Sequence, residues 1–410
     1  MNDTATSPRR FAVPAGVVLL GLVSLLTDVS SESIFPVLPV YFTAVLGGST
    51  VLLGLMEGLA DFAASSLDLA SGFVSDRTGR RKWLATLGYA FSSAAKVLLV
   101  LVTSAAGVVG FRVVERLGKS IRGAPRDALL SSIASEANRG VAFGVHKALD
   151  KTGAIAGPLV AWLILRRLGQ NAHGFHTLFL VALVPAFLAV ALLAFSVPER
   201  VAPPRERLAL RAALASLGPR YRHYLAAAAL FSLAYASFAF LLLKASAVGF
   251  STGDVALLYA LFNATFTVVA IPLGRLGDKL GRRALIVVSY LLYAAMSLGL
   301  ALLDSKAGVG AMFVVYGVFY AIDEAQTRAY LADLSAPATR ATAMGVYGFA
   351  TGLVYLPASV VAGALWKAAG APATFGFAAV VAVLALAFFL AFGPDSRSAS
   401  LPIARPRQGR

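Results

Sequence analysis

The chain has 410 residues, of which 58% are apolar and only 14% are charged. Soluble globular proteins are about half apolar and about one quarter charged, so this composition excludes a soluble enzyme. The net charge of +16 does not indicate nucleic-acid binding, because the cations are spread over many short segments instead of forming one basic face. The absence of cysteine excludes disulfides, thiolate zinc sites and cysteine nucleophiles.

Twelve apolar segments follow one another along the chain, each long enough to cross a bilayer as a helix. The first follows Arg9 and Arg10, but no small-residue cleavage site comes after it, so we interpret it as a membrane span and not as an export signal. No alternation of apolar and polar residues indicates a barrel. The predicted fold is therefore an all-α polytopic membrane protein. Its predicted spans are 14–45, 51–75, 83–104, 106–134, 139–165, 174–196, 223–247, 254–276, 284–303, 308–333, 338–367 and 373–393.

The lysines and arginines outside the spans are distributed unevenly. One set of joints and ends contains 22 of them, whereas the opposite set contains only Arg166, Arg167, Lys306 and Lys367. Because cationic loops stay on the cytoplasmic side, both termini are predicted to be cytoplasmic, as an even number of spans allows. We expect an integral protein of a bacterial inner membrane whose basic surface contacts anionic lipid and not nucleic acid.

The longest joint divides the chain into two halves. Six spans precede it and six follow, which predicts an N-terminal bundle at 1–196, a linker at 197–222, a C-terminal bundle at 223–395 and a tail at 396–410. The loop segment 72–81, GFVSDRTGRR, recurs 202 residues later as 274–283, GRLGDKLGRR. The halves therefore have the pattern of an internal duplication.

This repeated pattern, G-x-x-x-D-[RK]-x-G-R-R, resembles the loop signature of the major facilitator superfamily, and the likeness covers the whole chain. It implies two pseudo-symmetric six-helix bundles that rock around a central cavity. In that family the loop takes part in an ionic cluster that stabilises one conformation. The residues to which the resemblance assigns this switch are Gly72, Asp76, Arg77, Gly79, Arg80, Arg126, Asp127, Gly274, Asp278, Gly281 and Arg282.

Ionisable residues inside spans are costly in lipid and are therefore functional candidates. They concentrate in the first six spans, where an acid that exchanges its proton could couple transport to a proton gradient. The proton-coupling candidates are Asp28, Glu32, Asp61, Asp150 and Arg112. A static network of charges around the central cavity is the competing interpretation, and its further members are Glu57, Glu115, Arg116, Lys119, Arg122 and Lys147.

Two further signatures of the family's proton-coupled exporters are partly present. Arg112 matches the arginine of the fourth-helix pattern R-x-x-Q-G, whereas Glu115 and Arg116 replace its glutamine and glycine. Gly153 and Gly157 match the spacing of the fifth-helix pattern G-x-x-x-G-P. The resemblance thus favours efflux of a small organic solute in exchange for protons.

The second half is poorer in charge and richer in aromatic residues, which suggests that it contacts the substrate. Candidate substrate-facing residues are Tyr235, Lys244, Asn263, Asp323, Glu324 and Arg328. The alternative function is proton-coupled import of an organic anion or another small metabolite, bound by the cations of the fourth span. No nucleotide-binding loop or catalytic cluster is present, and we expect a monomer without cofactor or metal.

Overall fold

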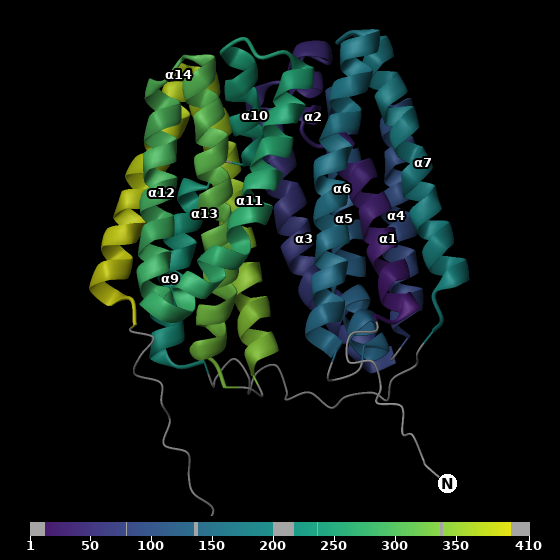
Figure 1. Ribbon diagram of the computed structural model, residues 1–410. Coiled ribbons are helices and arrows are strands. Elements are labelled where there is room, and N and C mark those ends of the chain that lie inside the picture. Colours follow the sequence, from purple (N-terminus) through teal and green to yellow (C-terminus); the bar gives the residue numbers. More distant parts are fainter. Residues whose placement is uncertain are drawn as a thin grey trace, which may run out of the picture.

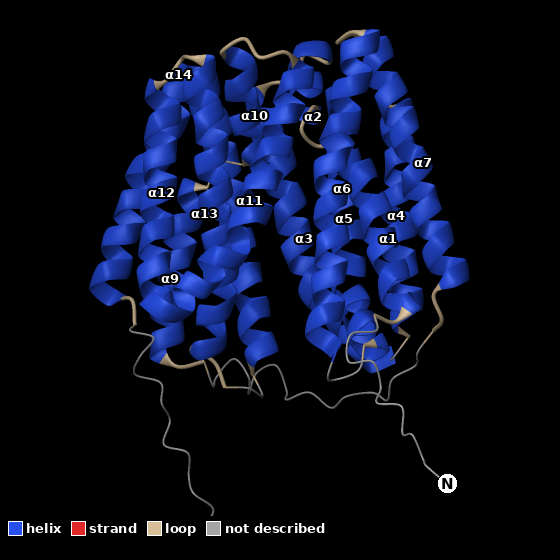
Figure 2. Cartoon of the chain, in the orientation of Figure 1, coloured by secondary structure: helices blue, strands red, loops and turns tan. Residues whose placement is uncertain are grey.

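The computed structural model describes residues 13–78, 80–134, 138–199, 217–235, 237–336 and 339–394. Within these ranges all regular secondary structure is helical (Figure 2). The elements are α1 (Ala15–Ile34), α2 (Leu38–Val40), η1 (Tyr41–Val45), α3 (Thr50–Thr78), α4 (Arg81–Leu101), α5 (Ala105–Ile133), α6 (Arg139–Leu168), α7 (Ala172–Ser196), α9 (Pro219–Ala234), α10 (Phe238–Ala247), α11 (Thr252–Leu280), α12 (Arg282–Leu302), α13 (Lys306–Asp333) and α14 (Arg340–Phe392).

Ten helical segments are long and apolar enough to cross a membrane. One of them, Thr342–Phe392, lies within α14, which is interrupted at Gly370, where a φ of 75° breaks the helix into two lengths that can each span. The 29-residue helix α5 is not among the ten, because it is rich in charged residues. With α5 included and α14 counted twice, the described chain has the twelve spans that the sequence predicts, and the predicted fold class is confirmed.

The spans form two groups, α1 to α7 and α9 to α14 (Figure 1). Each group begins and ends at the same end of the molecule. The starts of α1 and α9 and the ends of α7 and α14 all lie there, and we call it the terminal end. The opposite end is called the far end. The two groups of ribbons lie close together at the far end and diverge toward the terminal end (Figure 1).

Helices α3 and α14 form the main seam between the groups near the far end. Thr50 at the start of α3 donates a hydrogen bond to the carbonyl of Gly363, at 3.0 Å. A methyl group at Gly54 would lie 2.1 Å from the carbonyl oxygen of Ser359. The helices thus approach until their backbones touch, as small residues permit in membrane proteins.

We expect Gly54→Ala to destabilise this seam. The added methyl would overlap a backbone carbonyl that cannot rotate away, and such overpacking typically costs about 1–3 kcal/mol. The measurement is the thermal unfolding midpoint of the detergent-purified protein. Gly348→Ala on α14 is the matched control, because nothing lies within 4 Å of its added methyl. Equal unfolding midpoints for the two variants would contradict this account of the seam.

The first span of each group is broken where the groups meet. Helix α1 ends at Ile34, just before Pro36, and the span continues through α2 and η1. Its counterpart is interrupted between α9 and α10, where the Ser237 hydroxyl caps α10 by accepting from the backbone N–H of Ala239. Broken helices expose backbone and short polar side chains at mid-membrane, which is where transporters place their sites.

The outer surface of both groups is strongly apolar. Phe195, Val268 and Leu302 are between 71% and 89% exposed, and many other large apolar side chains share this orientation. Such a surface is compatible with lipid and not with water. Polar and charged side chains instead lie inside each group and between the groups, which directs the search for the site to that region.

Candidate functional site

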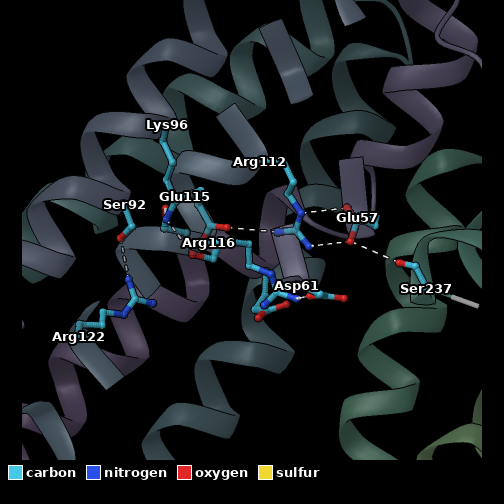
Figure 3. A network of polar contacts seen from close by, with 12 residues as sticks. Glu57, Asp61, Ser92, Lys96, Arg112, Glu115, Arg116, Arg122 and Ser237 are labelled. Carbon is cyan, nitrogen blue, oxygen red and sulfur yellow. Dashed lines mark hydrogen bonds and ion pairs between the residues drawn. The ribbon is translucent and has the colours of Figure 1, made fainter. Parts of the chain in front are cut away.

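A buried ion-pair network joins α3 and α5 two turns from the start of each helix (Figure 3). The guanidinium of Arg112 binds both carboxylate oxygens of Glu57, with Nε–Oε1 at 2.9 Å and Nη2–Oε2 at 3.1 Å. Its third nitrogen donates to Glu115 one turn further along α5, at 3.2 Å. All three side chains are at most 6% exposed. The guanidinium of Arg112 thus offsets the negative charge of two carboxylates, which would otherwise be costly to bury.

A second ion pair repeats this arrangement one turn closer to the terminal end. Arg116 donates to Asp61 at 2.5 Å, and each side chain is about one quarter exposed. Helices α3 and α5 run in the same direction, so residues one turn apart on each helix meet at a constant sequence separation of 55. The structure therefore brings together the predicted residues Glu57, Asp61, Arg112 and Arg116, and the pairs differ in their access to solvent.

The broken helices place two further groups against Arg112. Phe35, at the end of α1, lies under the guanidinium with 4.7 Å between the cation and the ring centre. Ser237, at the start of α10, donates to Glu57 at 3.4 Å across the junction between the groups (Figure 3). The sequence analysis missed Ser237, because a serine beside a helix break has no charge to single it out.

Asp28 and Asp150 meet between α1 and α6. The two acids lie within electrostatic reach of each other, and the Nζ of Lys147 lies 3.4 Å from Asp150. Two neighbouring carboxylates repel each other when both are ionised, so their proximity favours a proton on one of them. Both acids are half-buried, which makes the pair a candidate site of proton exchange.

The glycines of α6 make this contact possible. A methyl at Gly153 would lie 2.5 Å from the carbonyl of Leu25 and 3.0 Å from the Cβ of Asp28. Gly157 approaches the carbonyl of Val29 in the same way. The G-x-x-x-G-P segment of the sequence thus acts through close packing of α6 on α1, which brings the two acids together.

Two deeply buried cations of the first group have hydroxyl partners. Lys96 on α4 is 1% exposed and donates to Ser30 at 2.7 Å and to Ser31 at 2.9 Å. Arg122 donates to Ser92 at 2.7 Å (Figure 3). Its guanidinium also lies over the ring of Tyr89, 4.4 Å from the ring centre. Lys119 is exposed, and Asp28 and Glu115 are within its electrostatic reach. The interior charges of this group are therefore coupled through α1, α4 and α5.

Glu32 forms a link between the two groups. Its carboxylate accepts a hydrogen bond from the hydroxyl of Tyr259 on α11, at 2.7 Å. Tyr259 also packs against Phe35, with ring centres 5.4 Å apart. Lys151 on α6 lies over the ring of Phe266 on α11, at 4.1 Å. Charged side chains of the first group thus contact aromatic side chains of the second group.

The chain was compared with known proteins. The family model of the Major Facilitator Superfamily matches residues 20–322 and, in an overlapping second match, 225–409. An uncharacterized MFS-type transporter of Methanocaldococcus jannaschii is 36% identical over 374 residues, which are 90% of this chain and 92% of that protein.

The chain belongs to the major facilitator superfamily. It is a membrane transporter of small molecules and not an enzyme. The multidrug resistance protein MdtH of Photorhabdus laumondii is 27% identical over 138 residues, 32% of this chain and 33% of that protein. A variant of the nucleoside transporter NupG superposes with a TM-score of 0.78 at 14% identity, over 92% of this chain and 98% of that one. This structural likeness shows the shared fold.

The repeated loop of this superfamily member is anchored symmetrically. Arg81 donates to the carbonyl of Ala128, and Arg282 donates to the carbonyl of Ala329 and pairs with Asp333 at 2.9 Å. The equivalent arginines are thus 201 residues apart, whereas the sequence analysis aligned Arg80 with Arg282 and missed Arg81.

The remaining switch candidates are only partly described. Arg126 donates to its neighbour Asp127 at 2.9 Å. Gly274 and Gly281 lie on α11 and at its end, and Arg80 is exposed at the start of α4. Five members of the predicted set lie outside the residues whose side chains the structure describes, namely Gly72, Asp76, Arg77, Gly79 and Asp278.

The substrate-facing candidates of the second group occupy different environments. Lys244 pairs with Asp304 at 2.7 Å beside the loop between α12 and α13, at the far end. Asn263 is buried and donates to a carbonyl of its own helix. The Tyr235 hydroxyl lies 2.5 Å from that of Tyr316. Glu324 pairs with Arg328 at 3.3 Å. Asp323, the other acid among these candidates, forms no ion pair with a described residue and lies 3.5 Å from the hydroxyl of Thr327.

Proposed function

We propose that the protein is a secondary transporter that exports a small organic solute from the cytoplasm in exchange for protons. The observation that carries the proposal is the pairing of Asp28 and Asp150, two half-buried acids brought together by the close packing of α6 on α1, where one of them can hold a proton. A site of this kind can release its proton to one side of the membrane and regain it from the other.

The distribution of cations supports the direction of opening. If the cationic joints and termini are cytoplasmic, the terminal end, toward which the two groups diverge, faces the cytoplasm. This orientation would fit a monomer in a bacterial inner membrane with both termini inside. The likeness to a protein named for multidrug resistance supports efflux.

Flux measurements in proteoliposomes test the proposal. The purified protein is reconstituted, an artificial pH gradient is imposed, and uptake of candidate drugs, organic acids and sugars is compared with protein-free vesicles. Antiport predicts that solute accumulates in vesicles whose lumen is acidic. Accumulation only in vesicles with an alkaline lumen would instead establish the alternative, proton-coupled import.

A further inference from the structure

A small cavity lies in the first group of helices at the far end. It is bordered by the end of α4, the joint that follows α4, the start of α7 and the segment η1, and its volume is about 330 Å³. This volume is at the lower end of the range of small-molecule sites. Leu99, Val100 and Val102 line it on the side of α4, and Phe179 lines it on the side of α7. The cavity can therefore enclose a short apolar chain.

A buried hydroxyl group also lines this cavity. Tyr41 of η1 is 8% exposed, and its ring packs against those of Phe175 and Phe179, with ring centres 4.9 Å and 5.1 Å away. Among the described residues none forms a hydrogen bond with the Tyr41 hydroxyl. Buried polar groups are normally paired, because an unpaired one is costly. The hydroxyl is therefore available as a donor to a ligand in the cavity.

The start of α7 adds groups that attract an anion. Ala172 and His173 belong to its first turn and line the cavity, and the N–H groups and dipole at a helix start favour negative charge. His176, one turn further, and Thr103 of the joint after α4 line it as well. An imidazole donates hydrogen bonds and is a cation when protonated. None of the described residues that line the cavity is an acid.

We propose that this cavity binds a small amphiphile with an oxyanion head group, a carboxylate or a phosphate, on an apolar chain. The imidazoles of His173 and His176 and the hydroxyl of Tyr41 hold the head group, and the chain packs against Leu99 and Phe179. None of these residues belongs to the charge network or to the pair of acids, so the proposal goes beyond the proposed function and does not rest on it. Free amphiphiles and anionic phospholipids share this chemistry.

Equilibrium binding of labelled octanoate to the full chain tests the proposal. The protein is placed in nanodiscs of phosphatidylcholine, and empty nanodiscs give the background. We expect saturable binding that octanol, the neutral analogue, does not displace at equal concentration. The double replacement His173→Gln with His176→Gln should weaken octanoate binding by about tenfold or more, because glutamine cannot supply a positive charge.

Two further variants complete the test. His223→Gln changes an exposed histidine of α9, outside the cavity, and is the matched control, which should bind octanoate as the wild type does. Tyr41→Phe keeps the ring that packs on α7 and removes only the hydroxyl, so we expect it to fold and to weaken octanoate binding by about threefold or more. This variant decides the question if the double replacement does not fold.

The outcomes are distinguishable. Absence of saturable octanoate binding by the wild type overturns the proposal, as does displacement by octanol at equal concentration or unchanged binding by the double replacement. Equal weakening by His223→Gln would show an effect outside the cavity and would also overturn it. Nanodiscs that contain phosphatidylglycerol identify the source of the ligand. Reduced octanoate binding in them indicates an anionic phospholipid, unchanged binding indicates a free amphiphile, and both results uphold the site.

Discussion

Asp28→Asn is expected to reduce transport driven by a pH gradient to the level of protein-free vesicles, while exchange of solute for solute continues. In the structure Asp28 lies beside Asp150, and repulsion between the two carboxylates favours one exchangeable proton. Asparagine keeps the shape of the side chain, but it cannot release a proton. The bundles can therefore still rock around a bound solute, and only the coupling to protons is lost.

The measurements are gradient-driven accumulation and counterflow of a labelled solute in the same proteoliposomes. Asp254→Asn serves as control, since this acid lies in the first turn of α11 at the far end, away from the pair, and asparagine can still accept the hydrogen bond from Ser251, so both fluxes should survive its replacement. Gradient-driven accumulation by Asp28→Asn at the wild-type rate would refute the role of this acid. Loss of both fluxes would instead indicate that Asp28 maintains the structure or binds the solute.

Arg112→Leu is expected to cause the largest loss of stability. It leaves Glu57 and Glu115 buried at the junction without their shared cation, and removing one partner of a buried ion pair costs about 3–5 kcal/mol. Arg112→Lys should recover part of the loss, because lysine restores the charge but cannot bind Glu57 through two nitrogens. The measurement is the unfolding midpoint in detergent for each purified variant.

Arg116→Leu is the matched comparison, one turn along the same helix. Its pair with Asp61 is about one quarter exposed, so water can solvate the acid that remains, and we expect a smaller loss. The double replacement Arg112→Leu with Glu57→Gln should be more stable than Arg112→Leu alone, since it removes one of the orphaned charges. An equal or smaller loss for Arg112→Leu than for Arg116→Leu would contradict the importance assigned to burial.

The sequence predicted that acids of the second span and arginines of the fourth belong to one charge network, but not which acid pairs with which arginine. The spacing of Arg112 and Arg116 on α5 and of Glu57 and Asp61 on α3 places each set on one face of its helix. That two such faces must meet follows from the cost of charge in lipid. Which acid meets which arginine depends on the relative height of the two helices, and their shared direction and packing decide it.

Other parts of the site had no signal in the sequence. Lys244 stays a predicted substrate-facing residue, and its ion pair with Asp304 near the far end is a contact that the span pattern did not reveal. Ser237 and Tyr259 connect the two groups through hydrogen bonds to Glu57 and Glu32. Such neutral groups are common in spans and become informative only when the opposite helix is placed.

The sequence by itself determined the membrane class, the twelve spans, the internal duplication and the superfamily, because hydropathy and a repeated motif are local properties of the chain. The tertiary structure decided which charges are neutralised and which are not. Asp28 lies beside a second acid on α6 because two glycines allow α1 to approach closely, whereas Arg112 meets two carboxylates, Glu57 and Glu115. The periodicity of a helix fixes which residues share a face, but only packing determines what that face meets.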